Sequence, residues 1–563
     1  MPRTVQSGAA VASRFRSIQV RSLFLLLLGS LLLGACGDDT SEGPAVDAGT
    51  GAPWRSELFP ANWSPGLSGG DGRALHDFSY AGYRNGEAPL PSAEDLPVFD
   101  VRDHGADDTG NQDATVAIQT TIDAAEAAGG GIVWVPTGQY RCDGLLVVRA
   151  DGVVLRGAGR DQSRLTFTRH DGMTDQSHLK LQGELTLRAE LPLVADSAAQ
   201  AADLWVADTS ELAAGDDVTI GWVISDAFVA EHGMTGVWEA FNGTWQPFFR
   251  RQVVAIDSSV TPHRVTLDVP LRYPVHVRDQ ATLRAEEGYL REVGVEHLGL
   301  ANAVGWLEAW DQQRAHVLEL DGVADGWVAD VGSFPSPTAP SSGPGAGAHL
   351  QSGGIVVRQS KRITIANTRL EKAQNRGVGG CGYLFEIRQS SEVLTRDCQG
   401  FDGRHNFIQN WGFGTSGCVW LRCHTAGGRT FPSVDATFYG LGASDFHHSL
   451  AMANLVDSCV VDDGWTALNR QTESTGAGHT ATETAFWNVM GSGLLRSAQY
   501  GWGYVVGTGG DLAVNEVLLP PETEGSEPAD WLEGVGRASD PVPQSLYAAQ
   551  VELRLGRPPE TVP

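Results

Sequence analysis

Four polar stretches in the second half of the chain hold residue types that transfer protons and bind carboxylates. They are EKAQNRG (371–377), GRHNFIQNWGFG (403–414), DFHHS (445–449) and LNRQTESTGAGH (468–479). Each lies between short apolar strands, so we expect the four to occupy similar places on successive turns of the chain. Histidine transfers protons near neutral pH, while lysine and arginine stabilise a carboxylate or an enolate-like charge. The candidate catalytic residues are Lys372, Arg376, Arg404, His405, His447, His448, Arg470 and His479.

Amide and aromatic side chains in and near these stretches are suited to holding a sugar. The stretch 403–414 combines charged, amide and aromatic residues between glycines, a mixture that neither an apolar core nor a plain surface loop favours. It therefore fits a wall of a saccharide groove better than a simple turn. Asn406 and Asn410 have an alternative role in hydrogen-bonded ladders inside stacked coils. The candidate substrate-binding residues are Asn406, Gln409, Asn410, Trp411, Phe413 and Trp465.

Charge is distributed unevenly along the chain. The formal net charge is −28, which argues against a nucleic-acid partner. Residues 358–404 nevertheless carry nine Lys and Arg side chains against five Asp and Glu. A uronate polymer needs such a basic site, because arginine and lysine are the natural partners of a carboxylate. The alternative is that these cations form salt bridges on alternate faces of strands.

Two cleavage reactions compete at such a site. β-Elimination needs a base near the proton next to a uronate carboxyl, and a cation on that carboxyl. Hydrolysis needs two carboxylates across the glycosidic bond. Asp462, Asp463 and GAGH (476–479) weakly resemble the paired aspartates and GHG of polygalacturonases, but the NTD and RIK elements of that family are absent. The sequence therefore favours elimination over hydrolysis.

Three aspartates form a candidate metal site. Asp457, Asp462 and Asp463 offer the oxygen ligands that calcium, a hard cation, prefers. The alternative is that the Asp-Asp pair forms a solvated turn after a strand. Calcium is the cofactor that these residues indicate, and no other cofactor is expected.

Residues 99–148 indicate which fold positions these stretches. Asp113 can cap a helix, and apolar residues recur at helical spacing until Gly129–Gly131 end it. A buried strand (132–135), a turn and a second strand from Tyr140 follow. The sequence therefore predicts a helix packed beside short strands.

This stretch resembles the opening of the pectate-lyase-like superfamily, including its rhamnogalacturonase/epimerase-type domain. The matching residues are Asp103, Gly105, Ala106, Asp108, Gly130, Gly131, Val133, Pro136, Gly138 and Tyr140. The resemblance covers roughly residues 98–170 and implies a right-handed parallel β-helix whose N-terminal end is covered by the helix. It implies a fold and a link to carbohydrates, and does not define a reaction.

Short apolar strands recur along the rest of the chain. They lie in 353–376, 383–407, 417–428, 453–470 and 483–493, and SKRITIANT aligns with SSEVLTRDC at an offset of 30 residues. A coil of a solenoid buries its apolar surface only against the next coil, so such repeats favour stacking. We therefore predict an all-β fold, a right-handed parallel β-helix (solenoid) with an N-terminal capping helix and a small β insertion.

These patterns divide the chain into six parts. They are a lipoprotein signal peptide (1–35), a flexible tether (36–70), an N-terminal extension with the capping helix and first coils (71–203), the β insertion (204–290), the main coils (291–515) and a C-terminal tail with a terminal capping segment (516–563). The insertion is rich in aromatic residues, which we expect to form its own core rather than a sugar platform.

The first 36 residues resemble a bacterial lipoprotein signal. A basic start precedes LFLLLLGSLLL (23–33), which is too short for a comfortable membrane span, and Leu33-Gly34-Ala35-Cys36 follows. The resemblance implies cleavage before Cys36 and lipidation of that residue, which anchors the protein to a membrane outside the cytoplasm. Gly37 after the cysteine favours the outer membrane or cell surface over the inner membrane. The alternative is an ordinary cleaved signal.

The other cysteines show no metal-binding pattern. Cys398, Cys423 and Cys459 occur in similar contexts on successive repeats, and no CxxC or Cys/His zinc spacing is present. We expect buried thiols stacked between coils rather than disulfides or metal ligands. The remaining three are Cys142, Cys381 and Cys418.

The residues and the resemblance together predict a carbohydrate-active lipoprotein. The favoured function is cleavage of an acidic, uronate-containing polysaccharide by β-elimination. The alternatives are a polysaccharide hydrolase of polygalacturonase-like type and a non-catalytic glycan-binding or adhesive surface protein. The expected partners are a polysaccharide and, through Cys36, a membrane. The sequence leaves the oligomeric state open.

Overall fold

The computed structural model describes residues 53–92, 96–437, 439–515, 525–537 and 541–559, which belong to one compact unit. The predicted signal peptide, the lipidated Cys36 and the start of the tether lie outside the described residues. The predicted tether is wrong from residue 54 onward, because Leu58, Phe59 and Trp63 are buried against the rest of the fold. Their apolar side chains gain free energy by leaving water, which a flexible tether would forgo.

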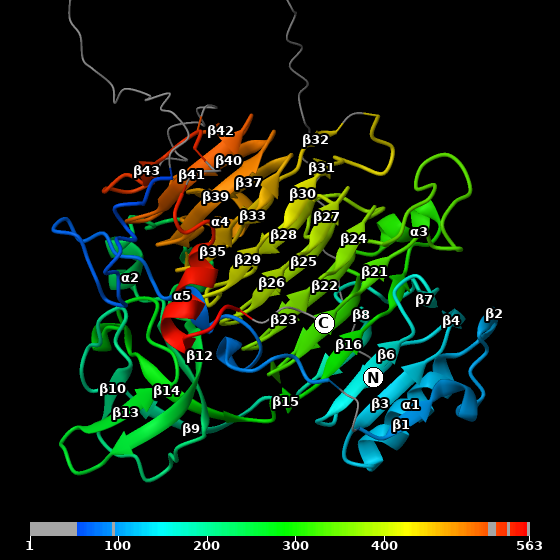
Figure 1. Ribbon diagram of the computed structural model, residues 1–563, viewed down its shortest axis with the longest axis horizontal. Coiled ribbons are helices and arrows are strands. Elements are labelled where there is room, and N and C mark those ends of the chain that lie inside the picture. Colours follow the sequence, from blue (N-terminus) through cyan, green and yellow to red (C-terminus); the bar gives the residue numbers. More distant parts are fainter. Residues whose placement is uncertain (1–52, 93–95, 438, 516–524, 538–540, 560–563) are drawn as a thin grey trace, which may run out of the picture. The chain divides into compact units, whose positions relative to one another are not determined.

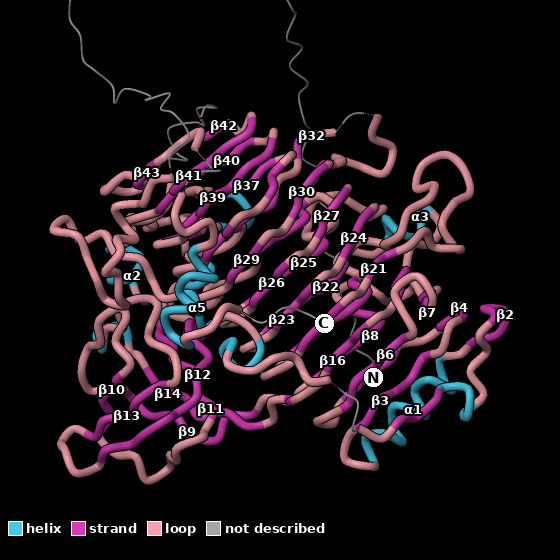
Figure 2. The backbone as a smooth tube through the Cα atoms, in the orientation of Figure 1, coloured by secondary structure: helices cyan, strands magenta, loops and turns pink. Residues whose placement is uncertain are grey.

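The architecture is a parallel β-helix built from three ladders of parallel strands, which Figure 1 shows stacked in chain order and Figure 2 shows as the bulk of the molecule. The first ladder contains β1 (Val98–Asp100), β3 (Gly131–Val135), β6 (Val153–Gly157), β16 (Gly294–Glu296), β20 (Trp327–Ala329), β23 (Thr364–Ala366), β26 (Leu394–Arg396), β29 (Val419–Leu421), β35 (Leu455–Asp457), β39 (Ala485–Gly491), β41 (Tyr504–Gly510) and β43 (Trp531–Glu533).

The second and third ladders complete each coil. The second contains β2 (Thr109–Asp113), β4 (Gly138–Cys142), β7 (Ser163–Phe167), β17 (Gly299–Ala301), β21 (Gly332–Ser333), β24 (Arg369–Glu371), β27 (Gln399–Phe401), β30 (His424–Ala426) and β36 (Val460–Val461). The third contains β5 (Leu146–Val148), β8 (Ser177–Gln182), β18 (His316–Asp321), β22 (Gly353–Arg358), β25 (Tyr383–Arg388), β28 (His405–Gln409), β33 (Ser444–Phe446), β37 (Gly464–Ala467), β40 (Leu494–Ser497) and β42 (Ala513–Val514).

The predicted repeat and capping helix are both confirmed. Thr364 pairs with Leu394, which is the 30-residue offset read from the sequence. The helix α1 (Thr115–Ala127) buries Ile118, Ile122 and Ala125 against the first strands, and the Asp113 carboxylate accepts a hydrogen bond of 2.9 Å from the backbone N–H of Thr115. Leucine, valine and isoleucine side chains from all three ladders form one continuous core. The predicted right-handed coiling stays a prediction.

The insertion is a six-stranded antiparallel sheet that begins at Thr186, earlier than the predicted boundary of 204. Its strands are β9 (Thr186–Pro192), β10 (Asp203–Val206), β11 (Asp217–Val223), β12 (Trp245–Asp257), β13 (His263–Leu267) and β14 (Thr282–Glu287), with α2 (Asp226–Glu231) after β11. The boundary was misplaced because β9 pairs with β14, a partner far along the chain. The aromatics form the insertion's own core as expected, with Trp222 stacked on Phe248 at 3.6 Å between ring centroids.

Both ends of the described chain cover the outer face of the first ladder. The C-terminal helix α5 (Leu546–Leu555) packs beside η1 (Phe78–Tyr80), and together they bury Leu394, Leu421 and Trp487. This covering differs from the predicted terminal cap, because α5 lies on the side of the coils. The remaining short elements are η2 (Tyr83–Gly86), η3 (Val101–His104), η4 (Glu239–Phe241), η5 (Val277–Asp279), β15 (Leu290–Arg291), α3 (Trp306–Asp311), β19 (Val323–Ala324), β31 (Arg429–Thr430), β32 (Gly440–Leu441), β34 (Ala451–Met452), α4 (Glu473–Gly476) and β38 (Ala481–Thr482).

The six cysteines that the structure describes are buried free thiols. The backbone N–H of Cys423 donates to Sγ of Cys459 at 3.3 Å, so thiols of successive coils are stacked as expected. Within the described residues, no helix is long and apolar enough to cross a membrane.

Candidate functional site

The outer face of the third ladder collects the polar side chains of the central coils. In β25, Phe385 and Ile387 point into the core. Successive side chains of a strand alternate between faces, so Glu386 and Arg388 lie on the opposite, outer face. The same ladder continues through β28 and β33 on the following coils (Figure 1). The ladder thereby brings side chains that are far apart in the sequence onto one surface.

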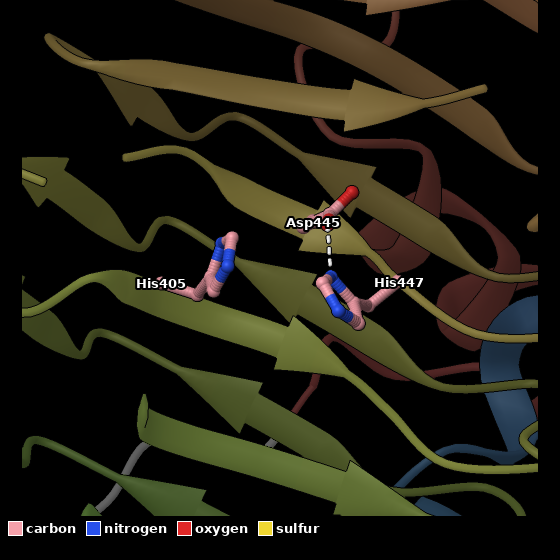
Figure 3. A group of neighbouring side chains, drawn as sticks. All are labelled: His405, Asp445 and His447. Atoms are coloured by element: carbon pink, nitrogen blue, oxygen red, sulfur yellow. Dashed lines mark hydrogen bonds and ion pairs between the residues drawn. The ribbon is translucent and has the colours of Figure 1, made fainter. Parts of the chain in front are cut away.

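Four residues meet on this face, and we call Tyr383, His405, Asp445 and His447 the histidine cluster. Tyr383 and His405 are paired neighbours of β25 and β28, with ring centroids 5.1 Å apart. The ring centroid of His447 lies 5.1 Å from that of His405 and 6.1 Å from that of Tyr383. Figure 3 shows His405 on one strand and His447 just beyond the end of the neighbouring strand, with Asp445 bonded to His447. The cluster therefore offers two imidazoles and a phenol to one reacting group.

Hydrogen bonds fix Nδ1 of each imidazole, while Nε2 of His447 faces Arg470 and the Ser474 hydroxyl, each at 3.3 Å. Nδ1 of His447 lies 2.6 Å from the Asp445 carboxylate, and Nδ1 of His405 lies 2.5 Å from the Ala443 carbonyl, so each Nδ1–H donates. Nε2 of His405 is buried without a partner among the described residues. Burial lowers the pKa of both histidines well below 6.5, with Arg404 adding to the effect at His405 and Arg470 at His447. Both imidazoles are therefore neutral at neutral pH.

A phenol and two guanidinium groups complete the chemistry around these imidazoles. Burial raises the pKa of Tyr383 to about 12, so its hydroxyl keeps its proton. Nη1 of Arg470 donates to Asp445 at 2.9 Å and also contacts His447. The Arg404 guanidinium lies 5.9 Å from the centroid of the Tyr383 ring. The cluster thus combines a base, a proton donor and cations within one patch.

A buried carboxylate lies beside the cluster on the same ladder. Glu386 accepts from Nε2 of His316 at 2.9 Å, from Nε of Arg388 at 2.5 Å and from Nδ2 of Asn410 at 2.7 Å. Burial opposes the charge of Glu386, but Arg388 and His316 outweigh it and lower the pKa of the carboxyl. Glu386 is therefore an ionised, fully engaged group. The adjoining cleft is lined by Asp175, Ser177, Arg314, His316, Glu319, Val356, Arg358 and Arg388.

The structure brings only part of the predicted catalytic set together. His405, His447, Arg404 and Arg470 meet at the cluster, and Arg376 lies beside Arg404 around Gly382. Lys372 is exposed on the corner after β24, outside the cluster. Its separate position means that the prediction of a shared site is not supported for this residue.

Two predicted catalytic histidines are directed toward the insertion instead. Nε2 of His448 donates to the Ser474 carbonyl at 2.8 Å, and the ring packs against Phe241. The His479 ring lies 5.2 Å from Tyr500, and its neighbour Gly478 abuts Trp238. Both rings help the insertion dock onto the coils, which explains their burial without a catalytic role.

Two of the predicted sugar platforms are wrong, because their rings are inside the protein. Phe413 is 0% exposed and belongs to the core of the insertion, and Trp465 is 1% exposed and stacks on Phe407 within the coils. Trp411 is the reverse case, with 57% of its surface exposed and its ring stacked beside His448. It remains the one member of the predicted aromatic set that presents a face to solvent.

The predicted amide side chains form hydrogen bonds within the protein. This is the alternative role that the sequence offered for Asn406 and Asn410. Nδ2 of Asn406 donates to Thr425, the Ala426 carbonyl and Asp463, which ties successive coils together. Nε2 of Gln409 donates to the His448 carbonyl at 3.1 Å. Asn410 is engaged by Glu386 as described. The NH2 group of each amide therefore has a partner within the protein, and Oε1 of Gln409 is buried without a partner among the described residues.

The predicted calcium site is wrong, because its three aspartates have separate partners. Asp457 is fully buried and accepts from Ser545 and from the backbone N–H of Tyr547, which anchors α5. Asp462 bonds His424 at 2.8 Å, and Asp463 accepts from the backbone N–H of Gly428. No pair of them is left to share an ion.

His405, Asp445 and His447 are the group of described residues that best approaches a cation site. One ligand atom from each lies within 4.8 Å of the others. Imidazole nitrogens suit transition metals rather than calcium. However, Arg470 is already bonded to Asp445 and in contact with His447, so a cation would have to displace a guanidinium. The geometry fits an oriented acid–base pair better than a metal centre.

Comparison with known proteins bears on the N-terminal coils. The family model described as "Rhamnogalacturonase A/epimerase, pectate lyase-like" matches residues 98–187. These coils are pectate-lyase-like. The pectate-lyase-like segment contains α1 and the first strands of all three ladders, and it ends before the histidine cluster.

Individual relatives match a short stretch of the chain. Mannuronan C5-epimerase AlgE6 of Azotobacter vinelandii is 49% identical over 72 residues, which is 12% of this chain and 8% of the epimerase. Alginate lyase 7 of the same organism is 42% identical over 72 residues, again 12% of this chain and 8% of the relative. The match thus spans a small fraction of either protein. Among solved structures, the tailspike gp61 of Pseudomonas phage phi297 has a TM-score of 0.45 and 12% identity, covering 78% of this chain and 74% of the tailspike.

Several functional candidates in and beside the cluster do not follow from the sequence alone. Asp445 and Glu386 belong to D-x-H and E-x-R patterns, and that spacing of two puts both side chains on one face of a strand. The pattern was present but was not used. Tyr383 and His316 carried no local signal, because only the register between coils brings them to the site.

Proposed function

We propose that the histidine cluster removes the proton next to the carboxyl of a uronate sugar, and that β-elimination of an acidic polysaccharide follows. The observation that carries the proposal is the unpartnered, neutral Nε2 of His405 beside the protonated phenol of Tyr383. A base and a proton donor on one side of a sugar are what elimination requires. The relatives that match a short stretch of this chain act on alginate or mannuronan by name, which supports a uronate substrate.

The proposed step conserves atoms and charge. His405 accepts the C5 proton, and the electron pair of the C5–H bond forms the C4–C5 double bond. The C4–O bond breaks, and the leaving oxygen takes a proton from Tyr383. Arg470 lies where a guanidinium can neutralise the carboxylate while charge develops on it. His447, oriented by Asp445, is the second base available at the same position.

The carboxylates nearby are poorly suited to hydrolysis. A hydrolase needs one carboxyl that holds a proton for the leaving group, which requires a raised pKa. Glu386 has a lowered pKa and three hydrogen-bond partners. Asp445 is occupied by Arg470 and His447. We therefore rank hydrolysis below elimination. We also rank a non-catalytic glycan-binding role below elimination.

Epimerisation at C5 is the second candidate, and the epimerase relatives favour it specifically. Epimerisation and elimination share the first step, the loss of the C5 proton. They differ afterwards, because an epimerase returns a proton to the opposite face of the sugar. The three predicted aspartates do not converge on one ion. We therefore propose that any calcium is bound to the carboxylates of the substrate.

We also propose that the protein is a lipoprotein held outside the cytoplasm, at the outer membrane or cell surface. Residues 1–36 carry this proposal, as given by the sequence. Metabolic labelling with a radioactive fatty acid tests it. Label should enter the wild-type protein and be absent from Cys36→Ser, and label retained by that variant would contradict the proposal.

The reaction itself is tested with purified protein and a panel of alginate, pectate, glycosaminoglycans and neutral glycans, with calcium or with chelator. Ultraviolet absorbance of unsaturated uronate and new reducing ends are followed together. Elimination predicts that both rise, and that both are abolished in His405→Gln. The control is His424→Gln, a histidine of the second ladder that also bonds an aspartate. Reducing ends without absorbance would mean hydrolysis and would refute the proposal.

A further inference from the structure

Three arginines beside the histidine cluster have no carboxylate partner. Most cations of the basic stretch 358–404 are paired, among them Arg358 with Glu319, Arg362 with Asp325, and Arg388 with Glu386. Arg376, Arg404 and Arg429 form no ion pair with any residue that the structure describes. In a chain with a net charge of −28, unpaired arginines gathered at one place need an explanation.

Backbone hydrogen bonds hold these arginines together. The N–H of Arg429 donates to the Gly403 carbonyl at 2.9 Å, next to Arg404. The N–H of Phe431 donates to the Arg376 carbonyl at 3.3 Å. Gly382 has a φ of +77°, and a Cβ there would lie 2.7 Å from the Cβ of Arg404 and 3.1 Å from the Cα of Arg376. Glycine at this position thus permits the close approach of the two arginines.

An aromatic ring lies near each guanidinium. Arg376 lies 5.5 Å from the centroid of Phe431, Arg404 lies 5.9 Å from that of Tyr383, and Arg429 lies 4.3 Å from that of Tyr439. Rings hold the planar guanidinium in place while leaving its N–H edge available for a bidentate contact. Arg404 is held further by a bond from Nη1 to the Gly377 carbonyl, while its Nε is buried without a partner.

The electrostatics of this group favour an anion. Burial lowers the pKa of Arg376 to about 10; Asp402 opposes this, and Arg429 reinforces it. Asp402 forms no ion pair with Arg376 within the described residues, so the positive charge there is not neutralised. A bound anion would relieve both the burial cost and the repulsion between the arginines.

We infer that Arg376, Arg404 and Arg429 form a subsite for an anionic group on the sugar next to the one that reacts. The inference rests on the proposed function for the reacting sugar and adds a property of the substrate. The group is a carboxylate or a sulfate, and its presence means a polymer that is charged on neighbouring sugars. Tyr383 belongs to the histidine cluster, and its ring centroid lies 5.9 Å from the Arg404 guanidinium. The subsite therefore adjoins the site of proton transfer.

Binding separates this inference from the reaction. We would titrate wild-type protein and Arg429→Gln with an oligouronate, a sulfated oligosaccharide and a neutral oligosaccharide of equal length, and measure each Kd. Arg429 is exposed, so its replacement should leave the fold intact. We expect the Kd for the preferred anionic oligomer to rise about tenfold and that for the neutral oligomer to be unchanged. The preferred oligomer tells whether the group is a carboxylate or a sulfate.

The matched control is Arg422→Gln, which lies between β29 and β30, one strand before Arg429. Arg422 is exposed and paired with Asp397 through two bonds of 2.7 Å, so its loss should not alter either Kd. An equal Kd for wild type and Arg429→Gln, or tightest binding of the neutral oligomer, would overturn the inference. A tenfold loss of binding in a protein without turnover would support the subsite while refuting the proposed reaction. Turnover by the wild-type protein together with an unchanged Kd in Arg429→Gln would support the proposed reaction and refute the subsite.

Discussion

The Oδ2 atom of Asp445 lies 2.6 Å from Nδ1 of His447, and both side chains are buried. The other carboxylate oxygen of Asp445 accepts from the hydroxyl of Thr466. The aspartate therefore fixes both the rotation and the tautomer of the imidazole, leaving Nε2 of His447 with its lone pair toward Ser474 at 3.3 Å. This relationship links the stacking of coils to the proposed chemistry, because β33 supplies Asp445 and the residue just after the strand is His447.

Asp445→Asn should lower kcat by roughly 10²- to 10⁴-fold, because the amide cannot hold the same tautomer of His447 or offset Arg470. The measurement is the initial rate of uronate double-bond formation. Asp462→Asn is the control, since it alters a similar aspartate–histidine pair, with His424, at an exposed position. Equal rates for wild type and Asp445→Asn would contradict a role for Asp445 in orienting His447.

The activity should survive mild acid. Because burial keeps the pKa of His405 and His447 well below 6.5, the bases stay unprotonated as the pH falls through 6.5. A profile of kcat/KM against pH should therefore have its acidic limb well below that value. An acidic limb at 6.5 would show that the base is a histidine with an ordinary pKa, and would contradict the assignment.

Stability should fall with acid through buried histidines such as His178. Burial lowers the pKa of His178 to about 4, so the unfolded chain binds this proton from about pH 6.5 downward while the folded chain does not. The contribution of neutral His178 to the free energy of unfolding is fully present above pH 6.5. It is lost as the pH falls toward 4, and the loss is ~3 kcal/mol at most. Denaturant unfolding of His178→Gln should give a shallower fall over this range. The exposed His104→Gln should behave as wild type, and matching curves for all three proteins would refute the prediction.

Trp411→Ala should weaken polymer binding up to about tenfold, because the exposed indole, stacked on His448, offers a flat face to a sugar. Equilibrium binding of the preferred oligosaccharide measures the change. Leu553→Ala on α5 is an equally exposed apolar control away from the third ladder, and it should bind normally. Unchanged binding in Trp411→Ala would mean that the indole is not a sugar platform.

Asp457→Ala should lower the free energy of unfolding by about 1–3 kcal/mol, because the N–H of Tyr547 and the hydroxyl of Ser545 lose their acceptor. Urea denaturation provides the measurement, and catalysis should be unaffected since Asp457 lies on the first ladder. Asp123→Ala, at an exposed position of α1, is the control for loss of an aspartate. Full stability in Asp457→Ala would show that α5 is held by its apolar contacts alone.

The coil architecture was predictable because each repeat is local. The helix α1 and the offset of 30 residues between Thr364 and Leu394 follow from apolar periodicity within a short window. The start of the insertion at Thr186 did not follow, since β9 pairs with β14 across almost a hundred residues of sequence. The docking of residues 54–63 was equally hidden, because its partners lie on the far coils.

The candidate site was predictable only in part, for a related reason. The histidines and arginines of 403–414 and 445–449 were found by residue type, but type does not tell which side of a strand faces the core. Phe413 and Trp465 were therefore taken for surface rings, although packing with the insertion and with Phe407 buries them. Likewise, Asp457 was predicted as a cation ligand, but its carboxylate accepts a hydrogen bond from the backbone N–H of Tyr547 in α5.

Release of tritium from C5 of a labelled polyuronate tests the central claim most directly. Removal of this proton is common to elimination and epimerisation and is absent from hydrolysis, so tritium in the water reports the proposed step alone. The account predicts release by the wild-type protein, strong loss of release in His405→Gln and normal release in His424→Gln. New reducing ends without tritium in the water would contradict it.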